Sequence, residues 1–412
     1  MSDPDWAFHA DDNAILDALA SGRRRAALGG YFGSAAAAEL ATLAGAAAQA
    51  PRRPGPPVLV IPGIMGSKLG DARRGRRNTG AGAGMIWFDP AAISAGRLAD
   101  LALPRTPALV PRGVQLFTYA RLILQLRLAG FDVATHPYDW RRGLDELGAE
   151  LAARLAAVPG PVHLVGHSMG GLVARMALAR LPPHKVRRLI LLGTPNRGSF
   201  AAVQALRGTY GFVRKVSRLD PSASPEALAA GVFHTFTGLY DLLPAGTARG
   251  GAEVDRPEAW PRQGLAPDPV QLARIAPIRA RLAPPDARML QILGHDCPTV
   301  VGLGHGRGGF TYRMGWHGDG TVPVALARLR GIPAWFVTEV HARLPCNGAV
   351  IHAIIDLLRR GRTNALPRQG RSRTTALPDV NDALLRRIGR GKIDWRELDA
   401  RDREAVLADL NT

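Results

Sequence analysis

Short apolar runs alternate with helical patterns through the middle of the sequence. The predicted strands are 58–61, 131–135, 162–165, 189–192, 298–303 and 334–337. The predicted helices are 114–129, 144–157 and 172–181. In the first of these helices Leu116, Tyr119 and Ile123 recur at spacings of three and four, which indicates one buried face. Strands alternating with helices of this length are typical of a mostly parallel sheet covered on both faces, so we expect an α/β protein.

The pattern changes on both sides of this region and once inside it. Residues 1–50 predict two or three short helices, and Pro51–Pro57 predicts a linker. The stretch 207–293 is rich in Pro and Gly and predicts a cap over the edge of the sheet. The expected organisation is a helical N-terminal extension (1–50), an α/β domain (56–360) with a cap insertion at about 207–293, and a linker with a helical C-terminal extension (361–412).

Composition places the chain among ordinary globular proteins. Hydrophobic residues make up 46% and charged residues 21% of the 412 positions, which excludes a fibrous or wholly disordered chain. No apolar run approaches the roughly 18 residues needed to cross a bilayer. The acidic start does not resemble a secretory signal, and two cysteines, Cys297 and Cys346, are too few for a disulfide framework. We therefore expect a reduced, cytoplasmic protein.

The net charge of +19 comes from one part of the chain. Residues 51–360 contain 39 Lys or Arg against 20 Asp or Glu, and only four of the 53 cations are lysine. This excess fits either an anionic membrane surface as a partner or a bias in codon usage. Nucleic acid is the weaker interpretation, because the clusters Arg23–Arg25 and Arg73–Arg77 lack interleaved aromatic residues that could stack on bases. The sequence leaves the oligomeric state open.

The clearest chemical motif is Gly166-His-Ser-Met-Gly170. It fits G-x-S-x-G, with an apolar run before it and a helical pattern after it. A serine on such a tight strand-to-helix turn is presented above the sheet, and glycines at the flanking positions avoid clashes. The N-terminus of the following helix favours a developing oxyanion. Ser168 is therefore the predicted nucleophile of an enzyme with the α/β-hydrolase fold.

A serine nucleophile needs a base, and the base needs an acid that orients it. In this fold the acid and the histidine follow the serine along the chain. Asp319, in the glycine-flanked loop Gly318–Pro323, is the predicted acid, because backbone N–H groups of a tight loop keep a carboxylate ionised. Asp296 is the alternative.

The predicted base is His341, which follows the apolar run 334–340 and precedes a helical pattern. Four other histidines compete with it. His167 adjoins the serine and is expected to point away from it, and His163 is expected to pack inside a strand. His317 is interpreted as a loop residue, and His352 as a residue that packs or caps within its helix.

Several segments, in order, resemble the lecithin:cholesterol acyltransferase and lysosomal phospholipase A2 family of α/β-hydrolases. These segments are 58–69, 86–90, 137–141, the motif around Ser168, 191–199, 318–323 and 341–351. Together they cover roughly residues 56–360. Within 137–141 we interpret Asp139, Trp140 and Arg141 as structural, with a role in shaping an acyl pocket as the alternative.

The resemblance implies a complete site. Ser168 would be the nucleophile, Asp319 the acid and His341 the base, and the backbone N–H groups of Met169 and Ile64 would form the oxyanion hole. It implies an O-acyltransferase or hydrolase that acts on a lipid ester through an acyl-enzyme, with no metal or cofactor. The alternatives are a general carboxylesterase on non-lipid esters and a catalytically idle scaffold used for binding.

Overall fold

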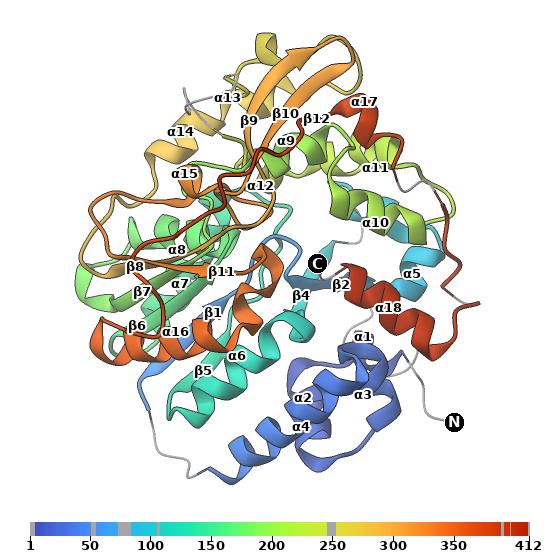
Figure 1. Ribbon diagram of the computed structural model, residues 1–412. Coiled ribbons are helices and arrows are strands. Elements are labelled where there is room, and N and C mark those ends of the chain that lie inside the picture. The colour runs from blue at the N-terminus through green and yellow to red at the C-terminus, as the bar shows by residue number, and fades with distance from the viewer. Residues whose placement is uncertain are drawn as a thin grey trace.

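The centre of the molecule is a six-stranded parallel sheet. The computed structural model describes residues 5–50, 55–72, 84–104, 108–244, 253–388, 391–395 and 397–410. The sheet has the order β11-β8-β7-β6-β1-β5, and all neighbouring pairs are parallel (Figure 1). Its strands are β1 (Pro57–Ile61), β5 (Asp132–Thr135), β6 (Val162–His167), β7 (Val186–Leu192), β8 (Met289–His295) and β11 (Ala334–Thr338). The expected α/β class is confirmed.

Helices cover both faces of this sheet. On one face α7 (Leu144–Ala157) packs against α8 (Met169–Leu178), and on the other α6 (Leu116–Leu128) lies beside α16 (Gly348–Arg360) (Figure 1). Because both faces are covered, β6 is buried along its whole length. The carboxyl end of β6 runs directly into α8, and this junction carries Ser168.

Two small antiparallel sheets flank the parallel one. The strands of the first are β9 (Thr299–Gly306), β10 (Gly309–Gly315) and β12 (Val380–Asn381). The strands of the second are β2 (Ser67–Asp71), β3 (Met85–Trp87) and β4 (Leu109–Val114). The predicted strand 298–303 is therefore β9, outside the central sheet. The second sheet was not predicted, because its strands are short and are interrupted by residues such as Gly70 and Pro111.

The described residues 5–50 of the N-terminal extension form four helices, not two or three. They are α1 (Trp6–His9), α2 (Asp12–Ser21), α3 (Arg25–Phe32) and α4 (Ser34–Gln49). Asp12 connects these helices to the second small sheet. Its carboxylate lies 3.2 Å from Lys68 Nζ in β2 and accepts a 2.8 Å hydrogen bond from the Val114 N–H in β4. Lys68 is buried, and burial lowers the pKa of its ammonium group. Residues 51–54 of the predicted linker and the cluster Arg73–Arg77 lie outside the described residues.

Five short helices recur through the described part of the stretch that was expected to be a cap. They are α10 (Gly211–Leu219), α11 (Pro225–Gly231), α12 (Thr237–Tyr240), α13 (Pro269–Ala273) and α14 (Ile275–Ala280), and they follow α9 (Phe200–Leu206). The expected range of 207–293 ends too late, since β8 of the central sheet begins at Met289. Pro284 and Pro285, which precede this strand, extend the irregular pattern toward it.

The segment after α16 runs back over the molecule. The Phe336 N–H of the edge strand β11 donates to the Pro367 carbonyl, 2.9 Å away, so the segment protects this edge. Farther along, α17 (Asp382–Leu385) brings the Asp382 carboxylate 2.7 Å from Arg207 Nη2, and both side chains are completely buried. α18 (Ala400–Leu410) then packs beside α3 and α10 (Figure 1). No helix in the described ranges is both long and apolar enough to cross a membrane.

Candidate active site

Ser168 occupies a strained turn between β6 and α8. Its φ of 52° and ψ of −125° lie in a region that residues with side chains rarely adopt. The turn also forces close packing. A Cβ on Gly166 would lie 2.7 Å from Gly171 Cα, and a Cβ on Gly170 would lie 2.4 Å from the Ile61 carbonyl oxygen. Only glycine fits at these two positions, which explains the spacing of the motif.

The structure brings the three expected side chains together. Ser168 Oγ lies 2.8 Å from His341 Nε2, and His341 Nδ1 lies 2.7 Å from Asp319 Oδ2. Ser168 can therefore donate its proton to the imidazole while the imidazole donates to the carboxylate. This is the arrangement that nucleophilic catalysis by serine requires.

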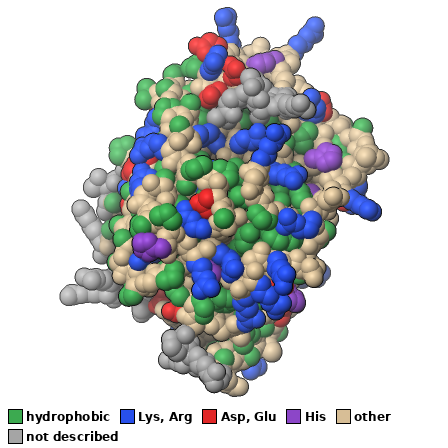
Figure 2. Space-filling view, turned by 90° about the vertical axis from the view of Figure 1, so that its left-hand side faces the viewer, with side chains coloured by type: hydrophobic (Ala, Val, Ile, Leu, Met, Phe, Trp, Pro, Cys, Tyr) green, Lys and Arg blue, Asp and Glu red, His purple; other side chains and the backbone are tan. Residues whose placement is uncertain are grey.

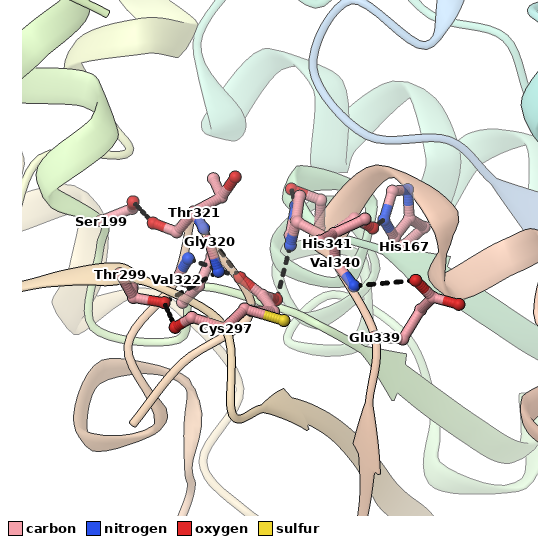
Figure 3. Close-up of polar contacts among 12 residues, drawn as sticks. His167, Ser199, Cys297, Thr299, Gly320, Thr321, Val322, Glu339, Val340 and His341 are labelled. Carbon is pink, nitrogen blue, oxygen red and sulfur yellow. Dashed lines mark hydrogen bonds and ion pairs between the residues drawn. The ribbon is translucent and has the colours of Figure 1, made fainter. Parts of the chain in front are cut away.

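The loop around Asp319 holds this carboxylate in place. Oδ1 of Asp319 accepts hydrogen bonds from the backbone N–H groups of Thr321 (3.0 Å) and Val322 (2.7 Å), so Oδ2 is left for His341 (Figure 3). The Gly320 N–H is held by Thr299 Oγ1 at 2.8 Å. Only 2% of the Asp319 surface is exposed. Its two carboxylate oxygens interact with three donors, the N–H groups of Thr321 and Val322 and the ring of His341. The tight glycine loop thus orients the Asp319 carboxylate toward His341.

The competing residues lie in other environments. The Asp296 carboxylate accepts a 2.9 Å hydrogen bond from the Arg373 N–H and lies 3.4 Å from Arg373 Nε. His163 is buried in β6, and His317 is exposed. His352 was expected to pack or cap, but it is exposed on the outer face of α16, where the helical period turns it away from the apolar side.

His167 was expected to point away from the site, and this expectation is wrong. Its ring centre lies 5.0 Å from that of His341 (Figure 3), and its Nε2 lies 3.1 Å from the His341 carbonyl oxygen. Its Nδ1 lies 2.9 Å from the Tyr119 hydroxyl. The expectation assumed that neighbouring side chains along a strand point in opposite directions. This rule fails here, because the backbone turns sharply at Ser168. Tyr119 had no signal of its own, since a tyrosine on the apolar face of a helix is typical of a core.

Two backbone groups were expected to donate to an oxyanion. Met169 is the first residue of α8, and the first N–H groups of a helix have no partner within it. Ile64 lies in the loop after β1 and lines the same cavity as Ser168. The preceding N–H, of Gly63, is already used by the Tyr119 hydroxyl at 2.9 Å. Of these two neighbours in the loop, Ile64 is therefore the one available as a donor.

Ser168 and His341 open into a cavity of about 350 Å³. Aromatic and aliphatic side chains dominate its wall, among them Ile64, Met65, Trp87, Phe88, Phe117, Phe212, Leu239, Leu242 and Val340. α18 contributes Leu407 to this wall, and α10 contributes Lys215, whose ammonium group lies 3.1 Å from Asp409 Oδ1. A mostly apolar cavity with a few polar groups at one end suits a substrate with an apolar part next to its reacting group.

The segment 137–141 supports this wall from behind. Arg141 and Asp139 form a buried ion pair, with Nη2–Oδ2 at 2.7 Å and Nε–Oδ1 at 2.8 Å. Trp140 donates to the Ser67 carbonyl and packs edge-on against Trp87, which lines the cavity. Within the described ranges, no group of three or more His, Cys, Asp or Glu side chains could hold a metal ion.

Comparisons with known proteins bear on the fold. A family model described as alpha/beta hydrolase fold matches residues 150–246, which include β6, Ser168 and α8. None of the curated proteins compared with the sequence matches it.

Three solved structures show distant likeness. A chain of the Tle4–Tli4 complex has a TM-score of 0.45 and 14% identity, covering 75% of this chain and 99% of that one. The mature lipase BlEst2 of Bacillus licheniformis has a TM-score of 0.35 and 17% identity, covering 71% and 86%. The pyrethroid hydrolase PytH has a TM-score of 0.33 and 15% identity, covering 74% and 98%. These likenesses are too weak to add to the assignment. From the family match, the six-stranded parallel sheet and the strand-turn-helix at Ser168, the chain has the α/β-hydrolase fold.

Proposed function

We propose that the protein is a serine acyl hydrolase or O-acyltransferase that cleaves an ester through an acyl-enzyme. The observation that carries this proposal is the pair of contacts from His341, one to Ser168 and one to Asp319. Ser168 Oγ attacks the ester carbonyl carbon while His341 Nε2 takes its proton, and Asp319 stabilises the imidazolium that forms. The backbone N–H groups of Met169 and Ile64 bind the oxyanion.

Collapse of the tetrahedral intermediate completes acylation. His341 returns the proton to the leaving alcohol oxygen, the bond from that oxygen to the carbonyl carbon breaks, and the acyl group stays on Ser168. Water or a second alcohol then attacks the acyl-enzyme with His341 again as the base. Water gives a free acid, and an alcohol gives a new ester.

The substrate that we propose is a lipid ester. The aromatic and aliphatic wall supports an acyl chain, because each buried methylene contributes about 0.8 kcal/mol to binding. The resemblance to the lecithin:cholesterol acyltransferase and lysosomal phospholipase A2 family points to the same class. A carboxylesterase that acts on non-lipid esters is the second candidate, since a cavity of about 350 Å³ also accepts a compact ester.

The first experiment measures labelling and products together. Wild type and Ser168→Ala are treated with a fluorophosphonate probe, and both are incubated with phosphatidylcholine/phosphatidylglycerol vesicles that contain a long-chain alcohol. We expect the probe to label the wild type only. New acyl ester identifies a transferase, and free fatty acid alone identifies a lipase or phospholipase. Cleavage of 4-nitrophenyl butyrate without any lipid product would favour the carboxylesterase. Absence of both labelling and turnover would support the idle scaffold and overturn the proposal.

A further inference from the structure

A second chain of hydrogen bonds runs behind the pair of contacts that His341 makes. The Gly63 N–H donates to the Tyr119 hydroxyl at 2.9 Å, this hydroxyl lies 2.9 Å from His167 Nδ1, and His167 Nε2 lies 3.1 Å from the His341 carbonyl oxygen. Tyr119 and His167 are both buried. We call these two residues the Tyr119–His167 bridge. The reaction proposed above assigns no role to it.

Only one arrangement of hydrogens satisfies the whole bridge. A carbonyl oxygen can only accept, so His167 Nε2 must carry a hydrogen and donate it to His341. In a neutral imidazole Nδ1 is then an acceptor, and Tyr119 donates its hydroxyl hydrogen to it. The hydroxyl oxygen in turn accepts from Gly63. If His167 were protonated, its Nδ1–H and the Gly63 N–H would both donate to the Tyr119 oxygen, and the hydroxyl hydrogen of Tyr119 would lose its acceptor.

The environment also keeps the bridge neutral. Burial, together with the smaller effect of the nearby His341, lowers the pKa of His167 to about 3. Burial raises the pKa of the Tyr119 hydroxyl well above its usual range. Neutrality matters here, because the ring centres of His167 and His341 are 5.0 Å apart and His341 must accept a proton during the reaction. A cation at His167 would oppose that step.

The bridge holds the backbone of His341 from one side while Asp319 holds it from the other. The His341 N–H donates to the Asp319 carbonyl oxygen at 2.8 Å, and the His341 carbonyl accepts from His167. With both of its backbone polar groups bound, His341 has a fixed base from which its ring reaches Ser168. The other end of the bridge holds Gly63, the residue before the proposed oxyanion donor Ile64.

We propose that His167, oriented by Tyr119, is a positioning residue that keeps the base and the oxyanion loop in register with Ser168. This inference depends on the proposed function. Its physical consequence is a loss of rate when the bridge breaks, because small displacements of reacting groups lower the probability of a reactive geometry.

Two amide variants separate the two ends of the bridge. In His167→Gln the side-chain amide is long enough to place its NH₂ near the former Nε2 and donate to His341. In His167→Asn the shorter amide can accept from Tyr119 but cannot reach His341. With 4-nitrophenyl butyrate as the substrate, we expect kcat to fall about 10–100-fold in His167→Asn and less than about 5-fold in His167→Gln. KM should stay within about 3-fold of the wild-type value in both.

Tyr119→Phe tests the middle of the bridge. We expect kcat to fall about 3–10-fold in this variant. The double variant Tyr119→Phe/His167→Asn should be no slower than His167→Asn alone, because the effects of substitutions in residues that act as a unit are not additive. His352→Asn, on the exposed face of α16, is the matched histidine control and should leave kcat unchanged. Thermal unfolding of each variant distinguishes a loss of rate from a loss of fold.

A measurement without substrate tests the hydrogens themselves. With ¹⁵N-labelled histidine, the NMR signals lost in His167→Gln identify His167, and we expect a neutral ring with hydrogen on Nε2 down to pH 5. A ring that titrates near pH 6.5, or hydrogen on Nδ1, overturns the inference. The inference is also overturned if His167→Asn folds and keeps the wild-type kcat. If His167→Asn does not fold, a wild-type kcat in Tyr119→Phe overturns it. A wild type that neither turns over ester nor reacts with a fluorophosphonate refutes the proposed function instead, and the NMR result then still decides the geometry.

Discussion

At the scale of single residues, Asp319 orients the proposed base. Its contact with His341 fixes which imidazole nitrogen carries the hydrogen, and its other oxygen is occupied by the loop backbone. Asp319→Asn keeps the shape but presents an amide to Nδ1. The amide NH₂ then donates to Nδ1, so the imidazole hydrogen lies on Nε2, which can no longer accept the proton of Ser168.

We therefore expect Asp319→Asn to lower kcat by about 10³–10⁴-fold with KM nearly unchanged. Steady-state kinetics on 4-nitrophenyl butyrate measures both constants. Asp296→Asn is the matched control, since Asp296 interacts with Arg373. A large rise in KM at constant kcat would remove Asp319 from this role.

Another residue, Asp241, connects the fold to pH. Burial raises the pKa of its carboxyl group from 3.8 to about 6, and the negative charge of Asp145 adds to this rise. The hydrogen bond from the Leu144 N–H and the charges of Arg274 and Arg279 act in the opposite direction. Below about pH 4 this carboxyl is protonated in the folded and unfolded chains alike. Between about pH 4 and 6 the folded chain binds the extra proton, so stability falls as pH rises through this window.

Asp241→Asn removes this titration. The free energy of unfolding of the variant minus that of the wild type should increase by up to about 3 kcal/mol from pH 4 to pH 6 and then stay constant. Urea unfolding at several pH values measures the difference. A difference that does not vary with pH would show that Asp241 ionises as easily in the folded chain as in the unfolded one.

At the scale of elements, Asp382 joins the C-terminal segment to the core. Its carboxylate accepts from Arg207 Nε (2.9 Å), the Tyr312 hydroxyl (2.6 Å) and the Phe310 N–H (3.1 Å). Arg207 also donates to two backbone carbonyls, of residues 263 and 265. Donors from three different residues therefore converge on one buried carboxyl group.

Asp382→Ala leaves the Arg207 guanidinium buried without its counter-charge. We expect the free energy of unfolding to fall by about 3–5 kcal/mol, measured by chemical denaturation. Asp379→Ala, at a nearby exposed carboxylate, should cost less than about 1 kcal/mol. Equal effects of the two substitutions would mean that the buried ion pair contributes no more than the exposed residue.

Elements differ in how well the sequence predicts them. The helix 144–157 and the strand 58–61 lie close to their predicted bounds, because their apolar periodicity reflects packing against one covered sheet. The same reasoning placed Ser168, Asp319 and His341 on turns that the structure brings together. It missed β2–β4, whose pairing is set by contacts between distant segments. It also missed Tyr119 and His167, whose roles come from a hydrogen bond across 48 residues.

At the scale of the whole molecule, the net charge of +19 distinguishes this protein from a neutral hydrolase. Figure 2 shows Lys and Arg side chains spread among hydrophobic ones over one face, with few Asp or Glu side chains between them. This distribution supports attraction to an anionic membrane surface, where each nearby Lys or Arg contributes about 1 kcal/mol. Such attraction is screened within about 10 Å at 0.1 M salt.

We expect the protein to sediment with phosphatidylglycerol-containing vesicles at low salt, and the bound fraction to fall by more than half between about 0.05 and 0.5 M NaCl. Ser168→Ala should bind equally, because the substitution changes no charge. Vesicles of phosphatidylcholine alone are the control. Binding that is the same on both lipids and insensitive to salt would mean that the positive charge does not attract the protein to membranes.

The ion pair between Arg207 and Asp382 also sets an order of events during synthesis. Its partners are 175 residues apart, so a ribosome adding about 5–20 residues per second makes the carboxylate roughly 10–35 s after the arginine. Until then the pocket around Arg207 cannot close without burying a lone cation. We therefore expect the region around Arg207 to stay partly open in the nascent chain, with apolar surface accessible to chaperones, until the segment after α16 has left the ribosome. Closure of the fold around Arg207 is in this sense a late step.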